Sequence, residues 1–97
     1  MRRHRTDNNQ EEIVGLLRKV GASVAITSNI GHGFTDTVVG FRGNTYLIEI
    51  KHGKNWTYTD AQVDFRRDWK GGPIDTIGSL EDVVAWVKRR SRVPATV

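Results

Sequence analysis

Apolar positions spaced three and four residues apart predict three helices along the chain. The first helix covers about Asp7–Val20, and the second follows Thr59, which has the spacing of a capping box with Gln62. The third follows Ser79, a second residue that can cap a helix. The apolar stripe of the first helix consists of Ile13, Leu16, Leu17 and Val20. We therefore expect one helix at the start, one in the second half and one near the end.

Runs rich in β-branched residues predict four short strands. The first is Ser23–Thr27, and "FTDTVVGF" and "TYLIEIK" follow as a hairpin joined by the turn "RGN". The segment "PIDTI" supplies the fourth strand, after the second helix. The resulting order is α-β-β-β-α-β-α, with a hairpin and a strand that returns after a helix. This order predicts an α/β fold with a mixed central sheet flanked by helices.

The composition is that of one globular domain over residues 1–97, with 37% hydrophobic and 27% charged residues. The absence of cysteine excludes disulfides and thiolate metal sites, and it fits a reducing compartment. No apolar run is as long as a membrane span, and no apolar segment follows the basic N-terminus as a secretory signal requires. We therefore expect a cytoplasmic protein with no membrane partner.

Basic residues gather at both ends of the chain, and the formal net charge is +4. The sequence "RRHR" lies near the N-terminus and "KRRSR" near the C-terminus, so that residues 1–6 and 91–97 are expected to be flexible basic ends. A basic balance favours polyanions, nucleic acid first. The same lysines and arginines could equally be solvated surface charges, so charge alone is a weak indication.

Three charged residues interrupt the apolar strands of the predicted hairpin. Asp36 lies near the start of one strand, and Glu49 and Lys51 share one face at the end of the next. With Arg42 taken opposite Thr45, Asp36 falls opposite about Lys51 and diagonal to Glu49, roughly 7–8 Å away. Two carboxylates at that separation repel each other unless a cation lies between them. The pairing thus predicts one cluster of charges.

This cluster has the composition of a metal site for phosphodiester hydrolysis. Mg²⁺ prefers oxygen ligands and keeps several waters, so Asp36, Glu49 and the carbonyl of Ile50 could hold it. A bound metal ion lowers the pKa of water, and Lys51 adds positive charge where the transition state gains negative charge. Each acid alone could instead be a strand-edge residue or half of a cross-strand ion pair.

Asp36 followed by Glu49-Ile50-Lys51 resembles the PD-(D/E)XK nuclease signature, with Thr35 where that pattern expects proline. Several segments more specifically resemble small phage and prophage nucleases of the VRR-NUC type, which are similar to Holliday junction resolvases. These segments are "DNNQEEIVGLLRKVGASV", "GHGFTD", "YLIEIKHG", "TDAQVDFRRDW" and "SLEDVVAWV", within roughly residues 7–87. The resemblance implies a restriction-endonuclease-like core.

The resemblance also implies a glutamate on the first helix and a glutamine on the helix after the hairpin. Glu12 lies about 100° from Ile13 on the helical wheel, at the edge of the buried stripe, whereas Glu11 falls on the opposite face. Glu12 is therefore the predicted member of the site, binding metal directly or through water. Gln62 is the matching glutamine, and it could orient water or phosphate or only complete the cap with Thr59.

The function implied by the resemblance is a DNA endonuclease dependent on Mg²⁺ or Mn²⁺. Its substrate would be branched or Holliday-junction DNA, and it would act as a homodimer, since symmetric cutting of two strands needs two sites. It would be encoded by a phage or prophage, and a helicase or another replication or recombination protein could be its partner. The alternative is a non-catalytic DNA-binding or assembly module on the same fold.

Overall fold

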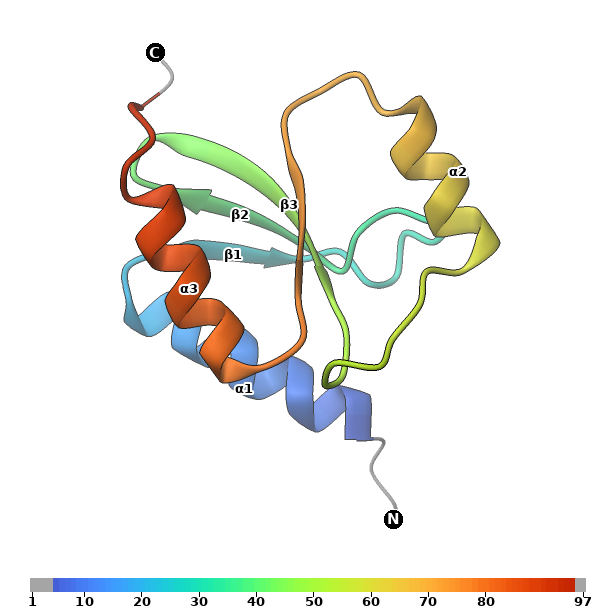
Figure 1. Cartoon of the computed structure of the whole chain (residues 1–97), viewed down its shortest axis with the longest axis horizontal. Coiled ribbons are helices and arrows are strands. Elements are labelled where there is room, and N and C mark those ends of the chain that lie inside the picture. Colours follow the sequence, from blue (N-terminus) through green and yellow to red (C-terminus); the bar gives the residue numbers. More distant parts are fainter. Residues whose placement is uncertain (1–4, 96–97) are drawn as a thin grey trace.

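The computed structural model describes residues 5–95 of the chain, with side chains from Asn9 onward. The helices and strands follow the predicted order α-β-β-β-α-β-α (Figure 1). They are α1 (Arg5–Lys19), β1 (Ser23–Ile26), β2 (Thr37–Phe41), β3 (Asn44–Ile50), α2 (Asp60–Asp68), β4 (Ile74–Ile77) and α3 (Leu80–Arg90). Both predicted caps are present, since the side chains of Thr59 and Ser79 accept hydrogen bonds from the first turns of α2 and α3.

The two predicted basic ends are only partly within the described residues, because residues 1–4 and 96–97 lie outside them. At the N-terminal end, α1 already begins at Arg5. At the other end, the carbonyl of Pro94 accepts a hydrogen bond from the side-chain amide of Asn44, at 2.8 Å. The residues after α3 therefore run back against the start of β3.

The four strands form one mixed sheet in the order β1-β2-β3-β4. The pairs β1–β2 and β2–β3 are antiparallel, and β3–β4 is parallel, with α2 in the crossover between the two parallel strands. A parallel pair requires such a crossover connection, because the chain must return to the starting end of the sheet. This sheet with its three helices confirms the predicted α/β fold class.

The hairpin turn lies one residue earlier than the predicted pairing placed it, and this corrects the register. Phe41 pairs with Asn44, so that the turn consists of Arg42 and Gly43. Both residues have a left-handed φ, 52° and 87°, as the two central positions of a type I′ turn require. Two-residue turns of this type dominate in hairpins because their twist matches that of the strands. The predicted pairing of Arg42 with Thr45, which would leave Gly43 and Asn44 as the turn residues, is wrong.

The corrected register brings the two acids closer than predicted. The last pair of β2 and β3 joins Thr37 to Ile48. Continued by one residue, it sets Asp36 opposite Glu49, whereas the predicted partner was Lys51. A direct cross-strand position is nearer than a diagonal one. The two carboxylates are therefore next to each other at the open end of the hairpin.

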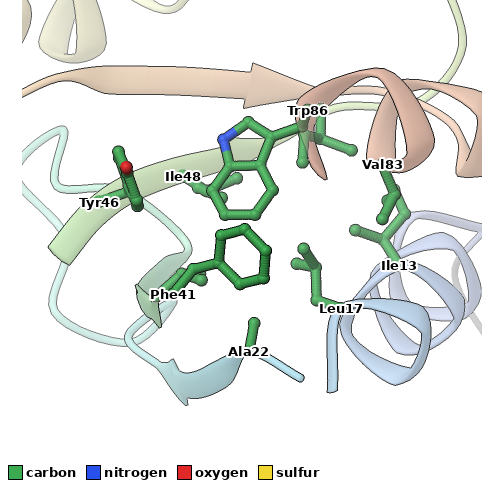
Figure 2. Packing of buried hydrophobic residues seen from close by; sticks show 10 residues of the cluster. Ile13, Leu17, Ala22, Phe41, Tyr46, Ile48, Val83 and Trp86 are labelled. Carbon is green, nitrogen blue, oxygen red and sulfur yellow. The ribbon is translucent and has the colours of Figure 1, made fainter. Parts of the chain in front are cut away.

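The hydrophobic core lies between the sheet and the helices α1 and α3 (Figure 2). Trp86 is fully buried at its centre, with its ring 5.2 Å from that of Phe41 and 5.3 Å from that of Tyr46. The cluster consists of Ile13, Leu17, Ala22, Val39, Phe41, Tyr46, Ile48, Ile77, Val83 and Trp86. No helix in the described part of the chain is long and apolar enough to cross a membrane.

The helix α2 lies apart from this core and contains no buried residue (Figure 1). It packs against the loop before β2, where the rings of Phe34 and Phe65 meet edge to face at 5.4 Å. Gly33 lies so close to the first turn of α2 that an added Cβ would fall 2.1 Å from the carbonyl oxygen of Ala61. A loop contact of this kind fixes the start of α2, and with it the position of Gln62.

Candidate active site

Asp36 and Glu49 are joined by two crossed hydrogen bonds to the backbone. The backbone N–H of Asp36 donates to Glu49 Oε1 at 3.1 Å, and the backbone N–H of Ile50 donates to Asp36 Oδ2 at 2.9 Å. Each carboxylate is thus held by an amide of the neighbouring segment. The open end of the hairpin fixes the position of both acids without using all of their oxygen atoms.

Glu49 is buried, with 1% of its surface exposed. Burial and, after it, the negative charge of Asp36 raise the pKa of the Glu49 carboxyl to about 7, although the positive charge of Lys51 acts in the opposite direction. An isolated buried carboxylate is unfavourable for folding, because its charge loses hydration. Perturbed acids of this kind cluster at functional sites.

Gln62 connects the acids to Lys51. Its side-chain amide Nε2 donates to Glu49 Oε2, and its Oε1 accepts from Lys51 Nζ at 2.8 Å. Oε1 also accepts from the backbone N–H of Thr59 at 3.0 Å, which completes the capping box of α2. The two roles that the sequence left open for Gln62 are therefore combined: the residue caps the helix and contacts the site.

A pocket of about 540 Å³ opens beside these residues. Four of the predicted site residues line it, namely Asp36, Ile50, Lys51 and Gln62. Glu49 lies buried next to them. The remaining lining residues are Gln10, Ile26, Ser28, Asn29 and His52. The structure thus brings together the acids, the lysine and the glutamine that the sequence pattern singled out.

Glu12 is not part of this pocket, which corrects the prediction for α1. Its side chain is exposed, and the residues that α1 brings to the site are Asn9 and Gln10. The side-chain amide of Asn9 donates to the carbonyl of Lys51, and Gln10 lines the pocket. On a wheel of 100° per residue, they lie about 40° and 60° from the buried Ile13, nearer than Glu12. The first turns of α1 therefore bring two amides, and not a carboxylate, to the site.

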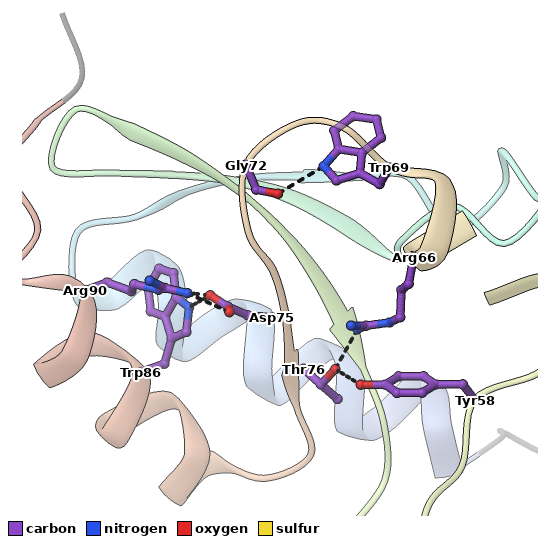
Figure 3. A network of polar contacts seen from close by, with 8 residues as sticks. All are labelled: Tyr58, Arg66, Trp69, Gly72, Asp75, Thr76, Trp86 and Arg90. Atoms are coloured by element: carbon purple, nitrogen blue, oxygen red, sulfur yellow. Dashed lines mark hydrogen bonds and ion pairs between the residues drawn. The ribbon is translucent and has the colours of Figure 1, made fainter. Parts of the chain in front are cut away.

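A second group of polar residues supports the site from the side of β4 (Figure 3). Thr76, which pairs with Glu49 in the sheet, lies 2.7 Å from the hydroxyl of Tyr58 and accepts from Arg66 Nη2 at 2.8 Å. The guanidinium of Arg66 lies 4.1 Å from the centre of the Tyr58 ring, and Lys51 Nζ lies 5.5 Å from it. These contacts fasten α2 and the loop before it to the sheet beside Glu49.

The donor atoms of the site fit a hard cation. Among the side chains that the structure describes, no three histidines, cysteines or acids gather closely enough to hold a metal ion. A pair of carboxylates and a backbone carbonyl, with water in the other positions, is a suitable set for Mg²⁺, whereas zinc sites use three or four protein ligands rich in nitrogen and sulfur. A cation beside Glu49 and Asp36 would also offset their mutual repulsion.

These features define a small α/β domain with a mixed sheet and an acid pair at the open end of its hairpin. The fold is that of a VRR_NUC domain: a solved structure with this title has a TM-score of 0.72 to the chain and 21% sequence identity. The match covers 86% of this chain and 94% of the other. Neither a protein-family model nor a curated protein matches the sequence. The shared fold agrees with the resemblance noted in the sequence.

Proposed function

We propose that the protein is a DNA endonuclease of the PD-(D/E)XK superfamily that hydrolyses phosphodiester bonds with Mg²⁺ or Mn²⁺. The observation that carries this proposal is the pair of the buried Glu49 and the half-buried Asp36, linked through Gln62 to Lys51 beside an open pocket. A module that only binds DNA gains nothing from acids beside a polyanion. The fold shared with a VRR_NUC domain supports the same conclusion.

In this proposal Asp36 and Glu49 hold the metal ion, and the carbonyl of Ile50 is the third protein ligand. The backbone of Ile50 is well fixed for this task, because its N–H is bonded to Asp36 and its side chain packs against the core. When bound, the metal supplies a water of lowered pKa and stabilises the charge on phosphorus. Glu12 has no part in the proposal, since its side chain is exposed outside the pocket.

The cation of Lys51 stabilises the negative charge that develops on the phosphate oxygens. Gln62 acts as a positioning residue, because it holds Lys51 Nζ with one atom of its amide and Glu49 with the other. Gln10 takes the position on α1 where the sequence predicted an acid, and as an amide it can orient water or phosphate but does not neutralise the metal.

The proposed substrate is branched DNA, Holliday junctions included, and the proposed active form is a homodimer. The net charge of +4 favours a polyanion, and symmetric cutting of two strands calls for two pockets. In a replication or recombination assembly, the same site would cut DNA opened by a helicase partner. Light scattering should give about twice the chain mass of 11.0 kDa at micromolar concentration. The mass of one chain would contradict the dimer.

A cleavage panel tests the proposed activity. Supercoiled plasmid, linear duplex and a synthetic four-way junction are each incubated with Mg²⁺, Mn²⁺ or EDTA. We expect cleavage with either metal and none in EDTA, and the junction should be cut faster than the linear duplex. Binding of all three substrates without cleavage in any metal would contradict the enzyme and favour the alternative of a non-catalytic DNA-binding module.

A further inference from the structure

Exposed basic side chains gather at the end of the molecule away from the pocket. They come from the last turn of α1, the turn between β2 and β3, the last turn of α3 and the residue that follows closely after it. We call this group the basic edge, and it consists of Arg18, Lys19, Arg42, Lys88, Arg89 and Arg92. Figure 1 shows these segments on the left of the molecule, with α2 and the loop before it on the right.

The three segments of the basic edge are in contact through their neighbours. Leu17 of α1 and Phe41 of β2 belong to the same buried cluster (Figure 2). The residues after α3 pass the hairpin turn so closely that an added Cβ at Gly43 would fall 2.4 Å from the Cβ of Ala95. The cations therefore share one region of the surface, although they lie far apart in the sequence.

The acidic side chains of the described residues lie on other parts of the chain. They are Glu11, Glu12, Asp36, Glu49, Asp60, Asp64, Asp68, Asp75, Glu81 and Asp82. Asp75, on β4, is paired with Arg90, whose Nη2 and Nε donate to it at 2.7 and 3.0 Å (Figure 3). The charge of Arg90 is thus offset by Asp75, and Arg90 is not counted in the basic edge, whereas Arg18 donates to the uncharged carbonyl of Val24. The result is a concentration of positive charge at this end.

Arg42 indicates that the basic edge has a binding role, because folding does not explain an arginine at this position. Cations in the last turns of α1 and α3 also favour helix formation, because they lie near the negative end of the helix dipole. Arg42 has no such explanation. It takes the first central position of a type I′ turn with a φ of 52°, where asparagine, aspartate or glycine is favoured. The sequence therefore keeps an arginine where its conformation is unfavourable for folding.

We infer that the basic edge binds the phosphates of a DNA duplex segment other than the one that enters the pocket. Arginine suits this task because its planar guanidinium forms paired hydrogen bonds with phosphate oxygens. The inference rests on the proposed function for the identity of the polyanion. It adds a second contact with the same substrate, at the opposite end of the molecule, as a branched DNA with more than one arm would provide.

Binding of a labelled four-way junction in EDTA, measured over a series of KCl concentrations, tests this inference. Arg42→Asn should weaken binding about three- to tenfold and lower the slope of log Kd against log salt by about one, since one phosphate contact is lost. The same variant should raise the Tm by about 2–5 °C, because asparagine fits the turn better. Lys88→Gln/Arg89→Gln should lower the slope by about two.

A charge-matched variant, Arg67→Gln/Lys70→Gln at the end of α2, serves as the control and should bind within about twofold of the parent protein. Equal losses in this control and in the edge variants would overturn the inference, and so would parent-like binding or a lower Tm for Arg42→Asn. Because EDTA prevents cleavage, binding is measured apart from activity. If the edge variants weaken DNA binding but the parent protein never cuts DNA, the proposed enzymatic activity is refuted and the inference on the basic edge is not. If the parent protein cuts DNA and the edge variants bind DNA as the parent protein does, the inference on the basic edge is refuted and the proposed activity is not.

Discussion

At the scale of the residue, Glu49 is the side chain around which the site is built. It is 1% exposed and lies beside Asp36, whose charge adds to the effect of burial in raising the pKa of Glu49 to about 7. Burying a carboxylate beside a second one is unfavourable for folding. The proposed metal site gives a reason for this arrangement, because folding alone does not favour it.

The raised pKa predicts how stability depends on pH in the absence of metal. The ordinary pKa is 4.5 and the folded value is about 7, so the folded protein binds the proton more tightly between these values. The contribution of Glu49 to the free energy of unfolding is fully present below pH 4.5 and is lost as pH rises through 7. The loss approaches about 3 kcal/mol.

Urea denaturation in EDTA at pH 5.5 and pH 8 measures this effect in the parent protein and in Glu49→Gln. The variant should lose much less stability between the two pH values, since a neutral amide does not titrate. The comparison isolates Glu49, because the two proteins differ at this position alone. Identical pH dependence in the two proteins would show that Glu49 does not titrate in this range.

Substitutions at Gln62 and Thr59 distinguish the effect of capping α2 from the effect of the contacts that Gln62 makes in the site. Both Gln62→Ala and Thr59→Ala remove a hydrogen bond of the capping box and should lower stability by about 1 kcal/mol. Gln62→Ala also removes the link between Lys51 and Glu49, and should slow DNA cleavage at least tenfold more than Thr59→Ala. Equal cleavage rates in the two variants would show that Gln62 acts only as a helix cap.

At the scale of the element, the sequence predicted the order of helices and strands but not the register of the hairpin. Helical periodicity, β-branched runs and caps are local signals, and all were present. The segment "RGN" is compatible with a two-residue turn at Arg42-Gly43 or at Gly43-Asn44, and a left-handed conformation is unfavourable for an arginine such as Arg42. The register therefore could not be read from the sequence, and it decides whether Asp36 faces Lys51 or Glu49.

The contribution of α1 was mispredicted for a different reason. The helical wheel placed Glu12 at the edge of the buried stripe, which is correct as geometry. The first turns of α1 extend beyond the core, however, and there Asn9 and Gln10 point to the site. The buried face of the wheel indicated both amides. The family pattern implies a glutamate on this helix, and Asn9 and Gln10 were therefore not predicted as members of the site.

The docking of α2 depends on Gly33 and predicts a difference between two glycines of one loop. Gly31 and Gly33 both have a left-handed φ, 78° and 80°, but only at Gly33 would an added Cβ meet the backbone, at Ala61. Gly31→Ala should cost about 1 kcal/mol through its conformation alone. Gly33→Ala should cost at least 2 kcal/mol and should slow cleavage, because α2 and Gln62 must move.

Thermal unfolding and cleavage rates of Gly31→Ala and Gly33→Ala check this prediction. Gly31→Ala is the matched control, since it has the same backbone conformation without the close contact. If both variants had the same Tm and the same cleavage rate, the contact with Ala61 would not position α2.

At the scale of the whole molecule, the acidic site and the basic edge lie at different ends. The acid pair and its pocket lie at the open end of the hairpin, and the basic edge lies at the end where the hairpin turns. The core between α1, α3 and the sheet connects these ends, whereas α2 rests on the loop before β2. This arrangement would let one substrate contact both ends, with Gln62 of α2 beside the pocket.

The single-turnover rate of plasmid nicking in Mg²⁺ tests the central claim most directly. It is measured for the parent protein, for Asp36→Asn and for Asp64→Asn, which removes an exposed acid of α2 paired with Arg67. Loss of a metal ligand should slow nicking at least 100-fold in Asp36→Asn, and Asp64→Asn should match the parent protein. Equal nicking by the parent protein and Asp36→Asn would contradict the account.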